Sequence, residues 1–175
     1  MRKYWLAALT LVLVVTMSHA QAYKVLYKFG SKTGDPANPS GVIAQGRDGN
    51  LIGTTYAGGS IEDGTVFQIT PAGKLTLLHD FNGADGWGPD GGVSLATDGL
   101  FYGSTQGGGL YNGGIAFKMT PGGTLMTLDA FQFEFSGGET DGSTPYAAPV
   151  EGMDGNLYGT TVYGGGGLND GYGTI

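Results

Sequence analysis

The sequence predicts an all-β protein built from tandem four-stranded units of about 50 residues. Three observations predict this fold class. Short motifs return at a regular spacing, each motif has the composition of a strand or a tight turn, and the chain after residue 22 shows no sustained helical spacing. Because four-stranded units of ~40–50 residues have the size of propeller blades, we expect an incomplete β-propeller. A β-solenoid or an open sheet array is the alternative.

The repeat is anchored by an Asp-Gly pair followed by a strand rich in aromatic residues and threonine. This block occurs at 48–55, 98–105 and 154–161, with offsets of 50 and 56 residues. A second block at 64–71 returns 50 residues later at 114–121. The 36 Gly and 7 Pro of the chain would suggest low complexity if they were aperiodic, but here they follow the repeat.

Each unit is expected to contain four strands in a fixed order. The first is short and apolar, and the Asp-Gly pair after it favours the positive backbone angles of a tight hairpin turn. We therefore interpret Asp48, Asp98 and Asp154 as turn residues. The second strand has the aromatic and β-branched residues that suit a pleated surface. The predicted first strands are 41–45, 92–96 and 148–153.

A glycine-rich loop leads from the second strand to the third. In the third strand of the first unit, alternation places Phe67 and Ile69 on one face and Val66 and Gln68 on the other. Pro-Ala-Gly and Pro-Gly-Gly turns then precede fourth strands at 74–81 and 124–131.

The first residues predict export. Arg2 and Lys3 precede an apolar run at 5–15, and Ala20-Gln21-Ala22 fits the pattern cut by signal peptidase. Residues 1–22 are therefore predicted to be a signal peptide, because the run is shorter than the ~20 residues of a membrane span. We expect a secreted, extracellular or cell-surface protein with no membrane insertion after signal removal.

The exported chain would be acidic. Removing Arg2 and Lys3 leaves six basic residues against 15 acidic ones, a net charge of −9. This charge repels nucleic acid, which we exclude as a partner. The chain has no Cys, so its stability must come from a buried core and from packing between units rather than from disulfides.

The predicted organisation after the signal peptide is one orphan strand and three repeats. Residues 23–29 look like the last strand of a unit, since Phe29 aligns with Phe81 and Phe131. Such a strand would complete the last blade of a closed ring, or serve as a short leader. The third repeat reaches only the start of its third strand, so we expect a fragment of a longer repeat protein. A three-unit protein completed by oligomerisation is the alternative. The repeats are 30–81, 82–131 and 132–175, the last truncated.

The combined motifs resemble the GloVer tandem repeat of secreted bacterial proteins, which often carry one of several C-terminal surface-sorting signals. The resemblance rests on the blocks at 64–67, 70–73, 154–156 and 157–161, and it extends over 23–175. It implies an exported, surface-associated repeat protein. It transfers no activity. Residues 23–175 contain no sorting signal of the family's kind, as we expect of a fragment whose C-terminal part is missing.

The residues after position 22 contain no catalytic motif. His79 is the one histidine of that part of the chain, and neither a Cys nor a Gly-x-Ser-x-Gly elbow accompanies it. We interpret His79 as a structural residue and expect a non-catalytic protein with a binding or scaffold role. The alternative is a propeller-type polysaccharide hydrolase or lyase that uses two loop carboxylates across a cleft.

Exposed aromatic residues are the candidate ligand contacts. Trp87, Tyr111 and Tyr163 lie in or beside glycine-rich loops, where they could stack on a carbohydrate or contact a surface protein. Tyr163 has a second interpretation, in which it aligns with Tyr56 and closes the second strand.

Acidic loop residues are the candidate metal ligands. Asp85, Asp90, Glu139 and Asp141 lie in related loops beside Pro89 and Pro145, and hard cations such as calcium prefer several oxygen ligands. The alternative is that these residues start turns and keep the loops soluble. No other cofactor is predicted.

Overall fold

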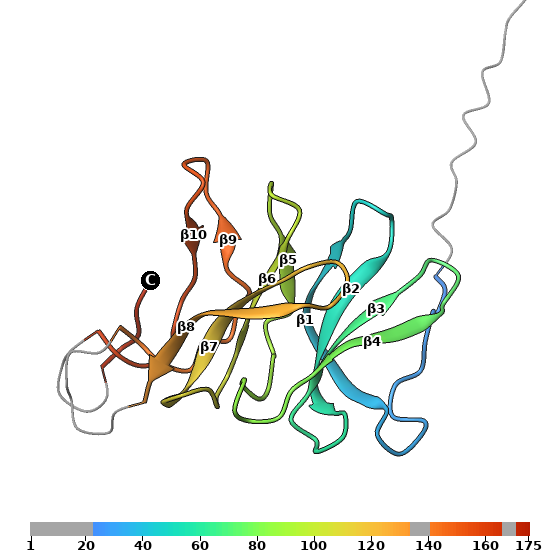
Figure 1. Ribbon diagram of the computed structural model, residues 1–175, viewed down its shortest axis with the longest axis horizontal. Helices are drawn as coiled ribbons and strands as arrows, with labels where there is room; N and C mark the ends of the chain where they lie inside the picture. The colour runs from blue at the N-terminus through green and yellow to red at the C-terminus, as the bar shows by residue number, and fades with distance from the viewer. Residues whose placement is uncertain (1–22, 134–140, 166–170) are drawn as a thin grey trace, which may run out of the picture.

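The computed structural model describes residues 23–133, 141–165 and 171–175, which form three antiparallel sheets and no helix (Figure 1). The first two sheets have four strands each, in the order of the chain. The all-β fold with four-stranded repeat units is thereby confirmed. The strands are β1 (Pro36–Gln45), β2 (Leu51–Gly58), β3 (Thr65–Ile69), β4 (Leu75–Asp80), β5 (Val93–Leu95), β6 (Phe101–Thr105), β7 (Asn112–Met119), β8 (Leu125–Gln132), β9 (Val150–Glu151) and β10 (Leu157–Tyr158).

The sheets stand side by side as the blades of an open, propeller-like array (Figure 1). Their first strands adjoin, because the backbone N–H of Val42 donates to the carbonyl of Gly91 at 3.2 Å. Gly41 and Gly91 lie so close to the next unit that a Cβ on either would be within 2.5 Å of its backbone. Strand β1 is longer than predicted and contains a register shift between Ser40 and Ala44.

The Asp-Gly pairs form turns in all three units, as predicted. The carboxylates of Asp48, Asp98 and Asp154 accept the backbone N–H two residues ahead, at 3.1, 2.9 and 3.1 Å. Each bond satisfies a backbone donor that the turn would otherwise leave unpaired.

A glycine at the start of each third strand fixes its approach to the second strand. Gly64, Gly114 and Gly173 have φ between 92° and 96°, and a Cβ on any of them would lie within 2.5 Å of a threonine carbonyl. In the third unit, Thr161 and Thr174 share a hydroxyl–hydroxyl hydrogen bond of 2.7 Å. Thr55 and Thr65 form the same bond in the first unit. Residues 173–175 therefore lie beside the second strand in the same register as the start of the third strand in the first unit.

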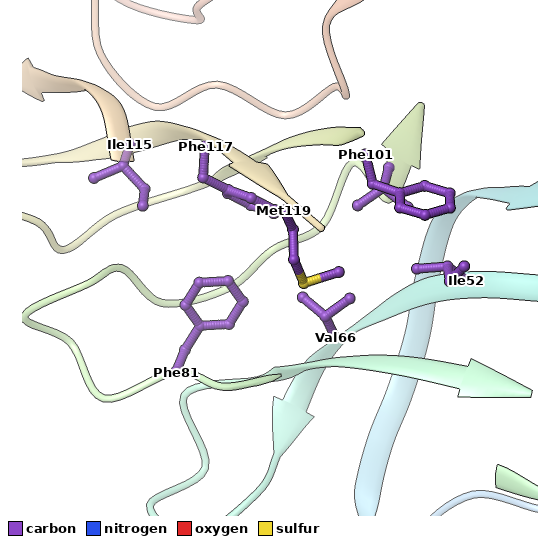
Figure 2. Close-up of a cluster of buried hydrophobic side chains, with 8 residues drawn as sticks. Ile52, Val66, Phe81, Phe101, Ile115, Phe117 and Met119 are labelled. Carbon is purple, nitrogen blue, oxygen red and sulfur yellow. The ribbon is translucent and has the colours of Figure 1, made fainter. Parts of the chain in front are cut away.

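The main core lies between the first two sheets (Figure 2). The predicted alternation of β3 holds, but both of its faces are buried because the second unit covers one face and residues 23–29 cover the other. Val66 belongs to the core shared with the second unit, while the ring of Phe67 packs against Phe29 at 5.0 Å. The buried core consists of Ile52, Val66, Phe81, Val93, Phe101, Ile115, Phe117 and Met119.

Residues 23–29 lie against the first unit. The end of β4 lies against the second unit in the same way. Phe81 packs against Phe117 at 5.7 Å, in the manner of Phe29 and Phe67. The carbonyl of Leu26 lies over Gly73, just as that of Leu78 lies over Gly123. No strand is assigned to residues 23–29 themselves, so their role as the last strand of a closed ring stays a prediction.

Candidate binding groove between the second and third units

The second and third units enclose a groove of about 450 Å³. We call the contact between the first two units the first interface, and the contact between the second and third units the second interface. The groove has largely apolar walls with two carboxylates among its lining residues. It is lined by Ser104, Ala116, Leu128, Asp129, Phe131, Asp141, Pro145, Ala147, Pro149, Leu157, Gly159, Thr160, Thr161, Thr174 and Ile175.

At the first interface the equivalent space is filled by the ring of Phe117. This ring lies over Gly103, where a Cβ would be 2.5 Å from Cζ of the phenyl group. Phe81 forms the adjacent wall and is completely buried. The side chain of Met119 completes the filling (Figure 2).

At the second interface the wall and the floor of this space are retained. The repeat alignment makes Phe131 the counterpart of Phe81, and Gly159 the counterpart of Gly103. A Cβ on Gly159 would meet only Pro149, at 3.6 Å, so among the residues that the structure describes no ring covers this glycine. Phe67 and Phe117 directly follow Val66 and Ala116, and Ile175 is the residue that aligns with Val66 and Ala116.

The two interfaces also differ in charge. At the first, Nε2 of His79 lies 2.9 Å from Oδ2 of Asp85, and the imidazole packs edge-on against Phe81. By the repeat offsets the counterparts of His79 and Asp85 are Asp129 and Asp141, which both line the groove. Two carboxylates therefore replace a histidine–carboxylate pair, which makes the groove attractive to cationic groups.

Trp87 packs against glycine. It forms a β-bridge with Gly107, on which a Cβ would lie 2.2 Å from the indole ring. The ring remains 38% exposed, so one face of it is available to a ligand. The glycine thus makes room for the tryptophan.

Tyr163 occupies the position that Gly107 has in the second unit. It forms a bridge with Ser143, as Gly107 does with Trp87 and Ala57 with Ala37. The alignment of Tyr163 with Tyr56 is therefore wrong by one residue, because Ala57 is the true counterpart. A shift of one residue moves a side chain to the opposite face of a strand.

The structure brings two of the three predicted aromatic residues to one place. The backbone N–H of Phe133 donates to the carbonyl of Tyr111 at 3.4 Å, and its ring packs against Tyr163 with centroids 6.4 Å apart. Tyr111 is 51% and Tyr163 is 42% exposed. These two residues flank Phe133, whereas Trp87 lies against Gly107.

The predicted calcium ligands have different surroundings. Both carboxylate oxygens of Asp85 are engaged, one by His79 and the other by the backbone N–H of Asn82 at 3.0 Å. Asp90 is half-buried, Asp141 lines the groove, and Glu139 lies outside the described residues. Within 23–133, 141–165 and 171–175, no three His, Cys, Asp or Glu residues are placed to hold a metal ion. Calcium binding that includes Glu139 stays a prediction.

Sequence reasoning did not single out Asp129, Phe131 or Gly159 as site residues. The repeat alignment contained a signal for them, since each has a counterpart 50 or 56 residues earlier. The alignment also accounts for the open space, because Ile175 aligns with Val66 and Ala116, the residues directly before Phe67 and Phe117.

A comparison with protein families identifies the repeat. Residues 11–175 match the family described as the Gloeobacter/Verrucomicrobia repeat. The chain belongs to this family. The resemblance to the GloVer repeat is thereby confirmed. None of the curated proteins matches the chain.

The membership establishes a repeat protein. Within the part of the chain that the structure describes, no helix is long and apolar enough to cross a membrane.

Proposed function

We propose that this family member is an exported, non-catalytic binding or scaffold protein whose exposed aromatic residues contact its ligand. The observation that carries the proposal is the exposure of Trp87, Tyr111 and Tyr163, which are 38%, 51% and 42% exposed. Tyr111 and Tyr163 both contact Phe133, so they form one aromatic surface. Such rings stack on a carbohydrate or pack against a surface protein.

The binding energy would come mainly from burial of apolar surface. Burying one phenyl side chain contributes about 1.5–3 kcal/mol. Trp87, Tyr111 and Tyr163 offer this surface to a carbohydrate or a surface protein.

An uncharged aromatic probe tests this surface. N-phenyl-1-naphthylamine should fluoresce more strongly on addition of the chain, and Tyr163→Ser should reduce this gain because Tyr163 is exposed beside Phe133. Tyr23→Ser, which removes an exposed tyrosine elsewhere in the chain, is the matched control. Equal fluorescence in both variants would show that the probe binds elsewhere and would refute this site.

Export is tested separately, by N-terminal sequencing of the chain secreted from a bacterial host. We expect a mature protein that begins at Tyr23, since the pattern at 20–22 is a signal-peptidase site. Retention of residues 1–22 on a cell-associated chain would contradict the export proposal and leave the binding proposal intact.

One observation favours a second candidate, a polysaccharide hydrolase or lyase. Asp129 and Asp141 line the same groove, and glycan cleavage uses two carboxylates across a cleft. Release of reducing sugar that Asp129→Asn and Asp141→Asn each abolish would establish it. Our binding proposal expects no such release.

A further inference from the structure

We infer that Tyr56, Asp90, Gln106 and Tyr146 form a binding site for a neutral glycan. The two tyrosine rings are its stacking surfaces, and the other two side chains are its hydrogen-bond partners. We call these four residues the tyrosine row. None of them belongs to the aromatic surface of Tyr111 and Tyr163, so the inference goes beyond the proposed function.

All three units contribute to the tyrosine row. A Cβ on Gly88, in the second unit, would lie 3.1 Å from Cε2 of Tyr56 and 3.3 Å from Oε1 of Gln106. The ring from the first unit and the amide from the second therefore lie over the same glycine. Nε2 of Gln106 in turn donates to the hydroxyl of Tyr146, in the third unit. A continuous surface thus joins the two tyrosines through the amide.

Both tyrosine rings are open to solvent. Tyr56 is 41% exposed and Tyr146 is 44% exposed. Single exposed aromatic side chains are normal on a protein surface, but these two are joined through Gln106 into one patch. The flat face of such a ring stacks on the apolar C–H face of a sugar, while its hydroxyl stays in contact with water.

Two hydrogen-bond acceptors of the row have no partner. Oε1 of Gln106 is buried and accepts no hydrogen bond from the described residues. Rotation of the amide would exchange its oxygen and nitrogen, and one polar atom would again be left over. The carboxylate of Asp90 is half-buried, and no hydrogen bond or ion pair engages it in the part of the chain that the structure describes. Because buried polar groups are normally paired, both acceptors call for a donor that a ligand can supply.

Asp90 belongs to the row by repeat symmetry. The offset of 56 residues makes Asp90 the counterpart of Tyr146, and the offset of 50 makes Tyr56 the counterpart of Gln106. Gln106 and Tyr146 touch across the second interface. Tyr56 and Asp90 have the equivalent places across the first interface.

The backbone beside the row has a costly conformation that is repeated in every unit. Asn38, Gly88 and Thr144 each precede a proline, and their φ angles are 55°, 61° and 58°. A left-handed conformation is unfavourable for a β-branched residue such as Thr144. Strain of this kind concentrates in loops whose shape serves a binding site.

These features specify a ligand with flat apolar faces and hydrogen-bond donors but without negative charge. A pyranose ring has these properties, since its C–H faces stack on tyrosine and its hydroxyls donate to carboxylate and amide oxygens. An acidic sugar would be repelled by Asp90 and by the net charge of −7. Because the row crosses three units, it suits a chain of sugars better than a single one.

Isothermal titration calorimetry with cellohexaose, mannohexaose and N-acetylchitohexaose tests the inference. At least one of these neutral oligosaccharides should bind, and hexagalacturonate should bind more weakly because it is anionic. Tyr56→Ala and Tyr146→Ala should each lower the affinity about fivefold or more, because a stacking ring is lost. If none of the neutral oligosaccharides binds, the inference is wrong.

Gly88→Asn is the sharpest variant. Its Cβ would lie 3.1 Å from the ring of Tyr56, so the ring must move, and affinity should fall about fivefold or more. The fold should be retained, since Asn38 has nearly the same φ in the first unit. Gly49→Asn is the matched control, because Gly49 also has a positive φ and a Cβ there meets nothing within 4 Å. Equal affinities in the two variants would overturn the inference.

The carboxylate is tested by Asp90→Asn. The affinity should fall about fivefold, because hydrogen bonds to an ionised acceptor are the stronger ones. Binding should be the same in the presence of EDTA, since sugar hydroxyls contact the carboxylate directly. Loss of binding in EDTA would place a metal ion at Asp90 and refute this direct contact.

Tyr163→Ser separates this inference from the proposed function. It should leave glycan affinity unchanged, and Tyr56→Ala should leave the fluorescence gain of N-phenyl-1-naphthylamine unchanged. If Tyr163→Ser removes glycan binding and Tyr56→Ala does not, this inference falls and the proposed function stands. If glycan binding depends on Tyr56 while the dye does not respond to Tyr163→Ser, the proposed site falls and the tyrosine row stands.

Discussion

The first and second interfaces are built from equivalent residues, yet one is a filled core and the other an open groove. Phe81 and Phe131 end equivalent strands, but Phe81 is completely buried whereas Phe131 is half-buried. The difference lies in the neighbour: the ring of Phe117 packs against Phe81, and the groove lies in the equivalent space beside Phe131. In a repeat array, the contribution of a residue to stability therefore depends on the neighbouring unit as much as on the unit to which the residue belongs.

Polar bonds at the turn ends hold both interfaces alike. Arg47 donates to the carbonyl of Thr97 at 2.5 Å, and the backbone N–H and hydroxyl of Thr97 donate to Glu151, each at 2.7 Å. Ser94 also donates to the carbonyl of Pro149. The third unit is thus held beside the second by polar bonds, even though the groove between them is open.

Truncation of the two phenylalanines should give the largest effect. Phe81→Ala should lower the free energy of unfolding by about 3–5 kcal/mol, because it leaves a cavity in a closed core. Phe131→Ala should cost about 1–2 kcal/mol, because it removes a side chain that is only half-buried. Urea denaturation followed by circular dichroism measures both. Equal losses would show that the second interface is packed as tightly as the first.

Addition of one methyl group should give the next largest effect. Gly103→Ala places a Cβ 2.5 Å from the ring of Phe117 and 3.0 Å from the carbonyl of Gly92, so it should destabilise the protein by about 1–3 kcal/mol. Gly159→Ala should change the stability by less than about 0.5 kcal/mol. The same denaturation experiment compares them, and a large loss in Gly159→Ala would mean that the floor of the groove is already covered.

The sequence was sufficient to predict the repeat, the strand order and the turns. Asp48, Asp98 and Asp154 have strong local preferences that do not depend on distant contacts, and they form the expected turns. Glycine positions were equally informative. The positive φ of Gly64 and Gly114 is a backbone conformation that residues with a side chain adopt only at an energetic cost.

The groove could not be predicted, because it depends on which rings meet across two units. The offset of Phe131 from Phe81 indicates an equivalent position but not its burial. The pairing of His79 with Asp85 likewise joins a strand to a loop of the next unit. The place of Tyr163, in contrast, could be predicted from the repeat offsets of 56 and 50 residues, which make Gly107 and Ala57 its counterparts in agreement with the bridges.

Restoring the histidine at the second interface should give a smaller effect. Asp129→His places an imidazole opposite Asp141, in the arrangement of His79 and Asp85. It should stabilise the chain by about 0.5–1 kcal/mol at a pH where the histidine is protonated. Asp129→Asn is the control, because it removes the like charge without adding a cation. If both variants gain equally in urea denaturation, loss of repulsion accounts for the whole effect.

The smallest effect concerns the turn ends, where the second and third units are alike. The hydroxyl of Tyr158 is the main cause that lowers the pKa of Asp154, whereas the backbone N–H of Leu100 contributes most to the lowered pKa of Asp98, ahead of Tyr102. A lowered folded-state pKa stabilises the protein above the unfolded value of about 3.9, and this gain is lost as the pH falls through the folded pKa. Tyr158→Phe should therefore raise the pKa of Asp154 more than Tyr102→Phe raises that of Asp98. Carboxyl chemical shifts followed from pH 7 to pH 2 measure both, and a larger change at Asp98 would contradict the assignment.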